Sequence, residues 1–550
     1  MTNLAEELRS IVKGEIDTSD ETRELYSHDA SIFELKPEVV VAPKDSADIQ
    51  ALVKYVTESK VENPRLSLTA RSAGTCMSGG AINDSIVLDM TKYFNQTLNV
   101  SATEAKVQPG VYYRDFEPKT LEKGVWMPSY PASRAICTVG GMVANNAGGE
   151  KSLQFGKVEN FVNELRVVFG DGNEYIVKPL TKKELIAKMA QGDYEGNLYK
   201  EVFELIENHY DAIMAAKPHV SKDSTGYHLW NVWDREAGIF DLTRLITGSQ
   251  GTLGIVTDIK FRLVPHPSHN GTLVIFLRTI KDLADIINLV LQHNPAAFEG
   301  FDNYTLVTSF KLVTFFRKQL GWLGLVKLVM QLIPEALKLF RRIPQMVLLV
   351  EFDGESPDEI KQKVHQLRED LKAYDHEAVF EEDETEAKAK KFWIMRRESF
   401  NILRQKVKDK HTAPFMDDLI VQPKYLPQFL PEISALIKKY DFIATIAGHM
   451  GDGNFHIIPL MNVEKESDKQ KLEPAMHEIN QLILKYEGSL AGEHNDGMIR
   501  GAFLPDMYGQ EVFGYFKRVK EIFDPHNIFN PHKKTDANWA YSMQHTRTHF

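Results

Sequence analysis

The chain has 550 residues, too many for one ordinary hydrophobic core, so two or three domains are expected. It is 43% hydrophobic and 26% charged, as is usual for soluble globular proteins, and its net charge of -11 argues against a nucleic-acid partner, which needs a basic surface. The only two cysteines, Cys76 and Cys137, exclude a disulfide framework and a cysteine-held iron–sulfur cluster. They favour a reducing, cytoplasmic setting, and residues 1–15 carry no secretory signal.

The first half of the chain predicts an α/β pattern. A polar, helical start precedes a short buried strand within 37–43, and residues 45–58 combine an aspartate cap with helical spacing. Residues 66–90 then predict strand, loop and strand. The pattern continues to a proline-rich end near residue 266, which we interpret as a domain boundary.

The second half begins with two similar units, each of strand, helix and strand. The first starts with residues 272–277 and 281–294, and the second with residues 345–354 and 357–375. Two such units can fold together as an antiparallel sheet backed by helices.

An unusual segment, residues 311–343, lies between these units. It carries seven Lys or Arg residues and a single acid, Glu335, among many large apolar residues. Lys327 and Pro334 break its longest apolar run, which is shorter than the roughly 20 residues of a membrane-spanning helix. We predict helices that either pack on the cap domain with a solvated basic edge or attach peripherally to an anionic membrane.

Three glycine-rich stretches, at 71–80, 131–149 and 248–254, suggest a bound pyrophosphate. Such a group needs several inward-pointing backbone N–H groups, which small residues and left-handed dihedral angles provide. One such stretch is as often structural as phosphate-binding, but three in half a chain favour a cofactor. The sequence has neither a GxGxxG motif opening a helix nor a GxxxxGK[ST] motif, which argues against Rossmann and Walker sites.

Residues 448–456 and 492–497 form a second group of motifs. The first stretch places two histidines around a glycine turn, and the second contains a Glu-His pair between glycines. Two imidazoles and one carboxylate form a regular set for a divalent metal that leaves coordination positions open. On spacing alone, a metal site and a structural turn are equally supported.

The order and wording of these motifs resemble the vanillyl-alcohol-oxidase-type flavoproteins. The similarity runs from about residue 37 to 534 and points to the branch of D-lactate dehydrogenase, the glycolate oxidase flavoprotein subunit and D-2-hydroxyglutarate dehydrogenase. It implies an α+β fold with a two-part FAD-binding domain of the p-cresol methylhydroxylase (PCMH) type at 1–266. It further implies a ferredoxin-like antiparallel cap domain for substrate at 267–490, and a C-terminal segment, 491–550, with a helix that returns to the flavin.

The resemblance also assigns the cofactor contacts. Thr75 stands where members with covalently linked FAD often place a histidine, so non-covalent FAD is expected, and Gln250 replaces the usual glutamate. Near the C-terminus, His532 replaces a glycine, and the tail beyond residue 534, with His545 and His549, is expected to be disordered. Neither cysteine receives a catalytic role. The implied FAD contacts are Ser72, Ala73, Gly74, Thr75, Gly79, Gly80, Pro131, Ser133, Thr138, Gly140, Gly141, Asn145, Ala147, Gly148, Gly251, Ile255 and Asn530, with Lys533 nearby.

By the same resemblance, a divalent metal, Zn or Mn, is held by His449, His456 and Glu493. His494 is then the base that removes the proton of the substrate hydroxyl, and a hydride passes to the flavin to give a 2-oxo acid. Arg396 clamps the substrate carboxylate. Asn454 either hydrogen-bonds the substrate or stabilises its turn.

The expected activity is that of an FAD-linked D-2-hydroxyacid dehydrogenase. Phe400, Phe415 and Met416 stand where the hydroxyglutarate-specific branch provides for a second carboxylate, so a D-lactate-like or glycolate-like substrate is preferred. A quinone, an electron-transfer protein or a cytochrome would accept the electrons, and the setting would be cytoplasmic or peripheral at the inner face of the membrane. Two alternatives stay open: an FAD enzyme of this fold without net oxidation, such as an ether-lipid synthase, and a non-catalytic flavin-binding subunit.

Overall fold

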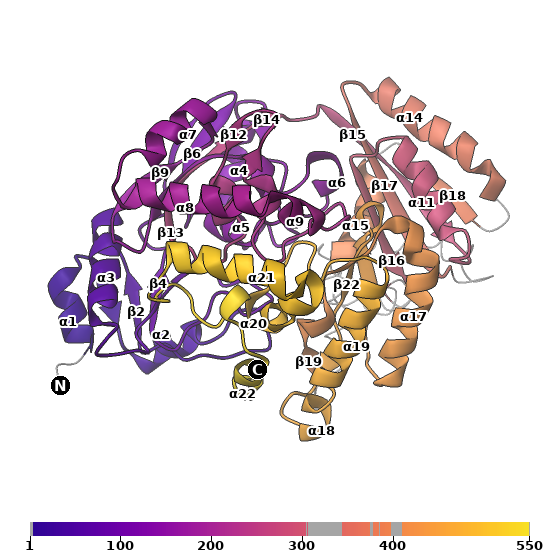
Figure 1. Cartoon of the computed structure of the whole chain (residues 1–550). Coiled ribbons are helices and arrows are strands. Elements are labelled where there is room, and N and C mark those ends of the chain that lie inside the picture. The colour runs from indigo at the N-terminus through magenta and orange to yellow at the C-terminus, as the bar shows by residue number, and fades with distance from the viewer. Residues whose placement is uncertain are drawn as a thin grey trace.

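The computed structural model describes residues 4–303, 305, 344–374, 378–383, 386–397 and 410–548. A four-stranded and a five-stranded sheet, two smaller sheets and several helices form the first part of the molecule, and a seven-stranded sheet with its helices forms most of the second (Figure 1). The long helix α21 (Leu504–Phe523) lies across the first part, although it comes from the end of the chain (Figure 1). The predicted α+β class is confirmed.

The N-terminal sheet has the strand order β1-β2-β4-β3, in which β2, β4 and β3 run parallel. All residues of β2 are buried, as expected for a parallel sheet covered on both faces. The helix after β2 begins with the predicted cap, because the side chain of Asp45 accepts a hydrogen bond from the N–H of Asp48. The elements are α1 (Leu4–Ile11), β1 (Glu15–Asp17), α2 (Asp20–Tyr26), β2 (Val39–Ala42), α3 (Ser46–Ser59), β3 (Leu68–Arg71) and β4 (Ile86–Asp89).

The next sheet is antiparallel, with the order β5-β6-β13-β8-β9. Buried residues alternate with partly exposed ones along β13, as expected for a sheet with one covered face. Its strands are β5 (Thr97–Val100), β6 (Glu104–Val107), β8 (Val162–Val168), β9 (Glu174–Val177) and β13 (Ile255–Arg262). The helices of this part are α4 (Tyr113–Leu121), α5 (Val139–Asn145), α6 (Ser152–Phe155), α7 (Lys182–Met189), α8 (Tyr194–Asn208), α9 (Tyr210–Ala215) and α10 (Thr243–Ile246). Two small sheets consist of the short strands β10 (Leu180–Thr181), β11 (Trp233–Asp234) and β12 (Ile239–Phe240), and of β7 (Val125–Trp126) and β14 (Val264–Pro265).

The cap sheet has the order β18-β15-β17-β16-β21-β22-β20, and its pairs are antiparallel. Its first four strands, with α11 and α14, interleave the two predicted units in the ferredoxin-like order. Strands β21 and β22 extend this sheet and carry two of the predicted metal ligands, His449 and His456. The elements are β15 (His269–Leu277), α11 (Leu283–Gln292), β16 (Ala297–Asp302), β17 (Met346–Gly354), α14 (Pro357–Asp370), β18 (Ala378–Asp383), α15 (Glu386–Arg397), β19 (His411–Thr412), β20 (Leu419–Ile420), α17 (Leu426–Lys439), β21 (Ile446–His449), β22 (Asn454–Ile457), β23 (Leu460–Met461), α18 (Glu466–Lys469) and α19 (Leu472–Lys485).

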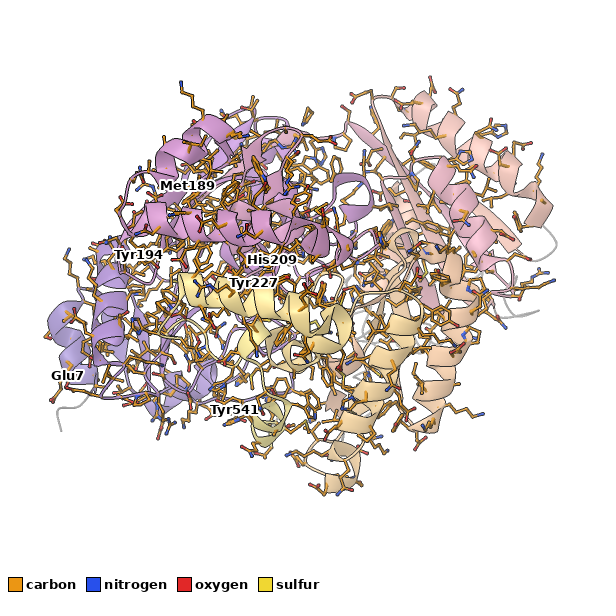
Figure 2. All side chains as sticks on the ribbon, viewed as in Figure 1. Glu7, Met189, Tyr194, His209, Tyr227 and Tyr541 are labelled. Carbon is orange, nitrogen blue, oxygen red and sulfur yellow. The ribbon has the colours of Figure 1, made fainter. Side chains whose placement is uncertain are left out.

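The C-terminal segment returns to the first part of the molecule, as predicted. Tyr508, Phe516 and Phe523 of α21 join the buried core of that part. The hydroxyl of Tyr194, at the start of α8, donates to the carbonyl of Phe523 at 3.3 Å, and Figure 2 shows Tyr194 beside α21. A short helix, α20 (Gly497–Arg500), directly follows the Glu-His motif and so links the predicted site to α21.

The predicted disorder of the tail is wrong for residues 535–548. Helix α22 (Trp539–Gln544) forms there, and Tyr541 marks it in Figure 2. The backbone of this tail hydrogen-bonds an N-terminal segment, because the N–H of Glu34 donates to the carbonyl of His545 and the N–H of Arg547 to that of Ile32, both at 2.8 Å. A polar sequence can be ordered in this way, because its partners come from the other end of the chain.

The segment 311–343 lies outside the described residues, so its predicted helices stay a prediction. Among the residues that are described, no helix combines the length and the apolar character needed to cross a membrane. The domain limits 1–266, 267–490 and 491–550 also stay a prediction.

Candidate active site

A single cavity of about 380 Å³ is bordered by all three glycine-rich stretches and by the histidine motifs. Arg396, His456, Glu493 and His494 also line it, so residues spread over more than 400 positions meet in one space. The predicted cofactor residues in its lining are Ser72, Ala73, Gly74, Thr75, Gly80, Pro131, Ser133, Thr138, Gly140, Gly141, Asn145, Ala147, Gly148 and Gly251. The small side chains of this lining fit a pyrophosphate-bearing cofactor.

Two glycines show why the cavity lining consists of small residues. Gly74 has a φ of +66°, and a Cβ there would lie 2.3 Å from a guanidinium nitrogen of Arg71. A Cβ at Gly148 would lie 2.9 Å from Oε2 of Glu493. The second glycine-rich stretch therefore packs directly against the Glu-His motif, and larger residues would separate the cofactor loops from it.

Three other predicted cofactor residues lie outside the cavity lining. Gly79 faces Phe33, and Ile255 is buried in the core of the N-terminal sheet. The side-chain amide of Asn530 donates to the carbonyls of Gly80 and Gln250, at 2.8 and 2.7 Å. Asn530 therefore connects the backbones of the first and third glycine-rich stretches. Its direct contact with FAD stays a prediction.

Gln250 connects the three glycine-rich stretches. Its amide nitrogen donates to Oγ of Ser78 at 3.1 Å and to Oδ1 of Asn145 at 3.2 Å, and its Oε1 accepts from the N–H of Gly497 at 2.8 Å. A glutamine can donate and accept at once, whereas an ionised glutamate only accepts. This difference gives a physical reason for the departure from the usual glutamate.

The two cysteines have the properties of unreactive thiols. Burial raises the pKa of Cys76 above its usual value and that of Cys137 to about 12. A thiol with a raised pKa stays protonated near neutral pH and is a poor nucleophile.

His449, His456 and Glu493, which we call the His/Glu cluster, lie close together. His449 ends β21 and His456 lies on the adjacent β22, while Glu493 comes from the segment between α19 and α20. One carboxylate oxygen, Oε1 of Glu493, lies 3.1 Å from Nε2 of His449 and 3.2 Å from Nε2 of His456. All three side chains are buried, and their ligand atoms lie within 4.8 Å of one another. This donor set fits a divalent cation.

Each member of the His/Glu cluster is held from outside by a charged side chain. Nδ1 of His449 lies 2.5 Å from Oε1 of Glu299, its cross-strand neighbour on β16. Nζ of Lys222 lies 3.6 Å from Oε2 of Glu493. Burial has the largest single effect and would lower the pKa of His449, but the carboxylates of Glu299 and Glu493 together outweigh it and raise the pKa to about 9. Such outer contacts are typical of metal sites, where they orient the ligands.

The predicted base, His494, lies beside the cluster with its side chain 21% exposed, so it is more accessible than the proposed ligands. Its ring stacks on that of His456, with the centroids 5.1 Å apart. Its Nδ1 lies 2.6 Å from Oδ2 of Asp417, and its Nε2 lies 3.8 Å from Oε1 of Glu493. Burial has the largest single effect and would lower the pKa of His494, but the carboxylates of Asp417, Asp418 and Glu493 together raise it to about 9.

Asp418 organises the backbone of the Glu-His motif. Its Oδ2 accepts from the N–H groups of Glu493 and His494, at 2.9 and 2.7 Å, and its φ is +68°. Its Oδ1 accepts from the side-chain amide of Asn454 at 3.0 Å. Asn454 is buried and does not line the cavity, so these contacts match the turn-stabilising interpretation. Its contact with substrate stays a prediction.

Arg396 lies near the end of α15 and reaches the cavity while buried. Its Nε donates to Oε2 of Glu299 at 3.0 Å, so Glu299 contacts both the proposed carboxylate clamp and a proposed metal ligand. The neighbouring Arg397 also lines the cavity and makes a bidentate pair with Glu150, at 2.8 and 2.7 Å. No sequence pattern points to Glu150 or Arg397 beyond their positions next to predicted site residues.

Phe415 and Met416 are buried in the cap core and do not line the cavity. Phe400 lies outside the described residues.

Comparison with known proteins identifies the family. Residues 37–177 match the sequence model of an FAD binding domain, and residues 266–534 match that of the FAD linked oxidases, C-terminal domain. The chain is 26% identical over 528 residues to a D-2-hydroxyglutarate dehydrogenase of Pseudomonas putida, which covers 95% of this chain and 50% of that relative. It is 27% identical over 523 residues to the glycolate oxidase subunit GlcD of Bacillus subtilis, covering 94% of this chain and 93% of the relative.

The chain thus spans about half the length of the D-2-hydroxyglutarate dehydrogenase that it matches. Among solved structures, p-cresol methylhydroxylase with substrate bound superposes with a TM-score of 0.67 at 14% identity, covering 98% of this chain and 96% of the other. The fold is therefore shared with that enzyme. The two matched domains, which together span most of residues 37–534, show that the chain belongs to the FAD-linked oxidases, and its fold is that of the PCMH-type enzymes.

Proposed function

We propose that the protein is an FAD-dependent dehydrogenase that oxidises a small D-2-hydroxy acid to the 2-oxo acid. The observation that carries this proposal is the single cavity, which joins the FAD loops to the His/Glu cluster, His494 and Arg396. A flavin, a metal and a carboxylate clamp side by side suit removal of two hydrogens from the carbon and oxygen of a 2-hydroxy acid. The names of the matched relatives support the same substrate class.

The residues of the chain would divide the chemistry as follows. Arg396 binds the substrate carboxylate, and Nε2 of His494 takes the proton of the substrate hydroxyl. When bound at His449, His456 and Glu493, a divalent cation such as Zn²⁺ or Mn²⁺ would acidify that hydroxyl and, through repulsion of like charges, favour neutral His494. Bound FAD supplies the acceptor for the hydrogen on C2 together with its electron pair.

Within this class we propose a monocarboxylate such as D-lactate or glycolate. The arginines of the described cavity lining are Arg396 and Arg397, and each is already paired with a carboxylate of the protein, Glu299 or Glu150. A second substrate carboxylate would have to displace Glu150 from Arg397. The other positions weighed for a distal carboxylate, Phe415 and Met416, are apolar and lie away from the cavity.

An anaerobic screen with D- and L-2-hydroxy acids tests the proposed function. The flavin absorbance near 450 nm should bleach with a D-2-hydroxy acid and recover when an electron acceptor is added. An ether-lipid synthase or a non-catalytic subunit would stay yellow with every member of the panel. The His/Glu cluster and His494 favour the dehydrogenase, because neither alternative needs a metal set beside a base.

We predict that FAD is bound without a covalent link. Thr75 occupies the position where a histidine would form one, and acid precipitation should therefore release the yellow colour into the supernatant. Colour that stays with the pellet would contradict this prediction. Peptide mapping of the coloured pellet would then identify the residue that holds the flavin.

The electron acceptor and the location are further proposals. A quinone, an electron-transfer protein or a cytochrome would reoxidise the flavin in a cytoplasmic setting. The basic, apolar segment 311–343 would allow peripheral contact with an anionic membrane. Sedimentation with vesicles tests this contact, which should require anionic lipid and weaken with salt.

A further inference from the structure

Asp417 contacts two of the site's histidines at once. Its side chain is fully buried, Oδ1 lies 3.1 Å from Nδ1 of His456, and Oδ2 lies 2.6 Å from Nδ1 of His494. Each carboxylate oxygen therefore serves one imidazole. His456 is a proposed metal ligand and His494 is the proposed base, so one carboxylate contacts both a ligand of the metal and the base.

An ionised carboxylate only accepts hydrogen bonds, so His456, whose Nδ1 hydrogen-bonds Oδ1, carries a proton on Nδ1. The contact of His494 with Oδ2 is short enough for a hydrogen bond but is not aligned as one, and the charge of the carboxylate favours a proton on the facing Nδ1 there as well. In the neutral ring this leaves the lone pair on Nε2. Nε2 of His456 and Nε2 of His494 both lie toward Oε1 of Glu493, at 3.2 and 3.8 Å, and both residues line the cavity. Asp417 thus selects the tautomer in which one ring can bind a cation and the other can accept a proton.

The backbone around Asp417 is fixed to the segment that carries His494. The guanidinium of Arg500, which is 2% exposed, donates to the carbonyls of Asp417 and Asn495, at 2.6 and 3.0 Å. The next residue, Asp418, accepts from the N–H of His494. These contacts connect the backbone around Asp417 to the segment that carries His494.

We propose that Asp417 is a positioning residue that fixes the orientation and tautomer of His456 and His494 together. Metal affinity and proton removal then depend on the same carboxylate. The part of this proposal that concerns proton removal rests on the proposed function. Asp417, His456 and His494 also satisfy the geometry of a cation-binding group. The distances from Nδ1 of His456 and Nδ1 of His494 to Asp417 are those of hydrogen bonds, so we interpret the two contacts as orienting the rings.

Glu299 offers a matched control. It is also a buried carboxylate on Nδ1 of a proposed ligand, His449, but its second oxygen contacts Arg396 instead of the base. Asp417→Asn and Glu299→Gln both preserve size and remove one charge. An asparagine can accept from only one of the two imidazoles and presents an N–H to the other, so one ring of the Asp417→Asn variant must change tautomer or rotate.

The experiment uses full-length, FAD-loaded protein and measures Co²⁺ affinity by chelator competition. Both variants should bind Co²⁺ about 10- to 100-fold more weakly, as for other outer contacts of metal sites. Flavin reduction is then measured at saturating metal and substrate. The limiting rate of Glu299→Gln should largely recover while its substrate KM stays raised, whereas that of Asp417→Asn should remain about 100-fold low, because its base is misoriented.

Equal limiting rates for the two variants at saturating metal would overturn the shared role of Asp417. Unchanged Co²⁺ affinity in Asp417→Asn would overturn its contact with a metal ligand. A parent protein that binds Co²⁺ but is reduced by no 2-hydroxy acid would instead contradict the proposed function. The Co²⁺ affinities would still decide whether Asp417 positions His456, because that measurement needs no turnover.

Discussion

Replacing His494 with alanine is expected to slow flavin reduction by the 2-hydroxy acid about 100- to 10,000-fold, the usual contribution of a general base. His494 lies beside the His/Glu cluster but is not one of the proposed metal ligands, so most of the metal should remain bound in the variant. FAD should also remain, because its proposed contacts lie in the glycine-rich stretches. Stopped-flow absorbance gives the reduction rate, and elemental analysis gives the metal content.

Chemical rescue makes this prediction specific for a base. His494 is partly exposed to a cavity of about 380 Å³, so alanine leaves space that free imidazole can enter. Added imidazole should restore part of the rate of His494→Ala. His526→Ala, which removes an exposed histidine away from the cavity, should behave like the parent protein with and without imidazole. A full reduction rate in His494→Ala would refute the assignment of the base.

The parts of the fold that the sequence predicted are those in which neighbouring residues decide the structure. The Asp45 cap, the buried strand β2 and the alternating strands and helices of the cap follow local patterns of charge and hydrophobicity. The glycine-rich stretches could also be recognised, because small residues at close spacing have few other physical explanations. The family resemblance then supplied which loops meet and which histidines converge.

The supporting residues could not be found in this way. Glu299 and His449 are 150 positions apart and meet only because β16 pairs with β21 in one register. Lys222 reaches Glu493 from a segment in which no cofactor or metal motif was recognised. A retrospective signal exists for Glu299, which is an acid in an otherwise largely apolar strand. Such a residue indicates a buried charge with a partner but does not identify the partner.

The C-terminal tail shows the same limit of sequence-based prediction, here for a segment that is ordered although disorder is expected. Its position at the end of the chain predicts disorder, yet Ser542 hydrogen-bonds the carbonyl of Met498 at 2.9 Å and the backbone pairs with residues 32–34. The stabilising partners belong to two distant segments. A terminal position does not show whether distant parts of the chain offer a segment hydrogen bonds.

Replacing Glu493 with glutamine is expected to remove metal and dehydrogenase activity together while FAD is retained. Oε1 of Glu493 lies between the Nε2 atoms of His449 and His456, so the substitution removes the negative ligand of the proposed set. Metal affinity should fall by more than the roughly 10- to 100-fold that loss of an outer contact costs. Glutamine preserves the volume of the side chain, and Lys222 keeps Asp452 as a partner at 3.1 Å, so folding should be preserved.

Glu487→Gln provides the matched control, since it removes an exposed carboxylate six positions earlier in the chain. That variant should keep parental metal content and reduction rate. Metal stoichiometry by elemental analysis, FAD content by absorbance and unfolding temperature are measured on all three proteins. If Glu493→Gln retains stoichiometric metal, or if a chelator that strips the parent protein leaves its turnover unchanged, the cation has no role at this cluster. The two imidazoles would then have to be explained as hydrogen-bond donors that fix Glu493 beside Gly148.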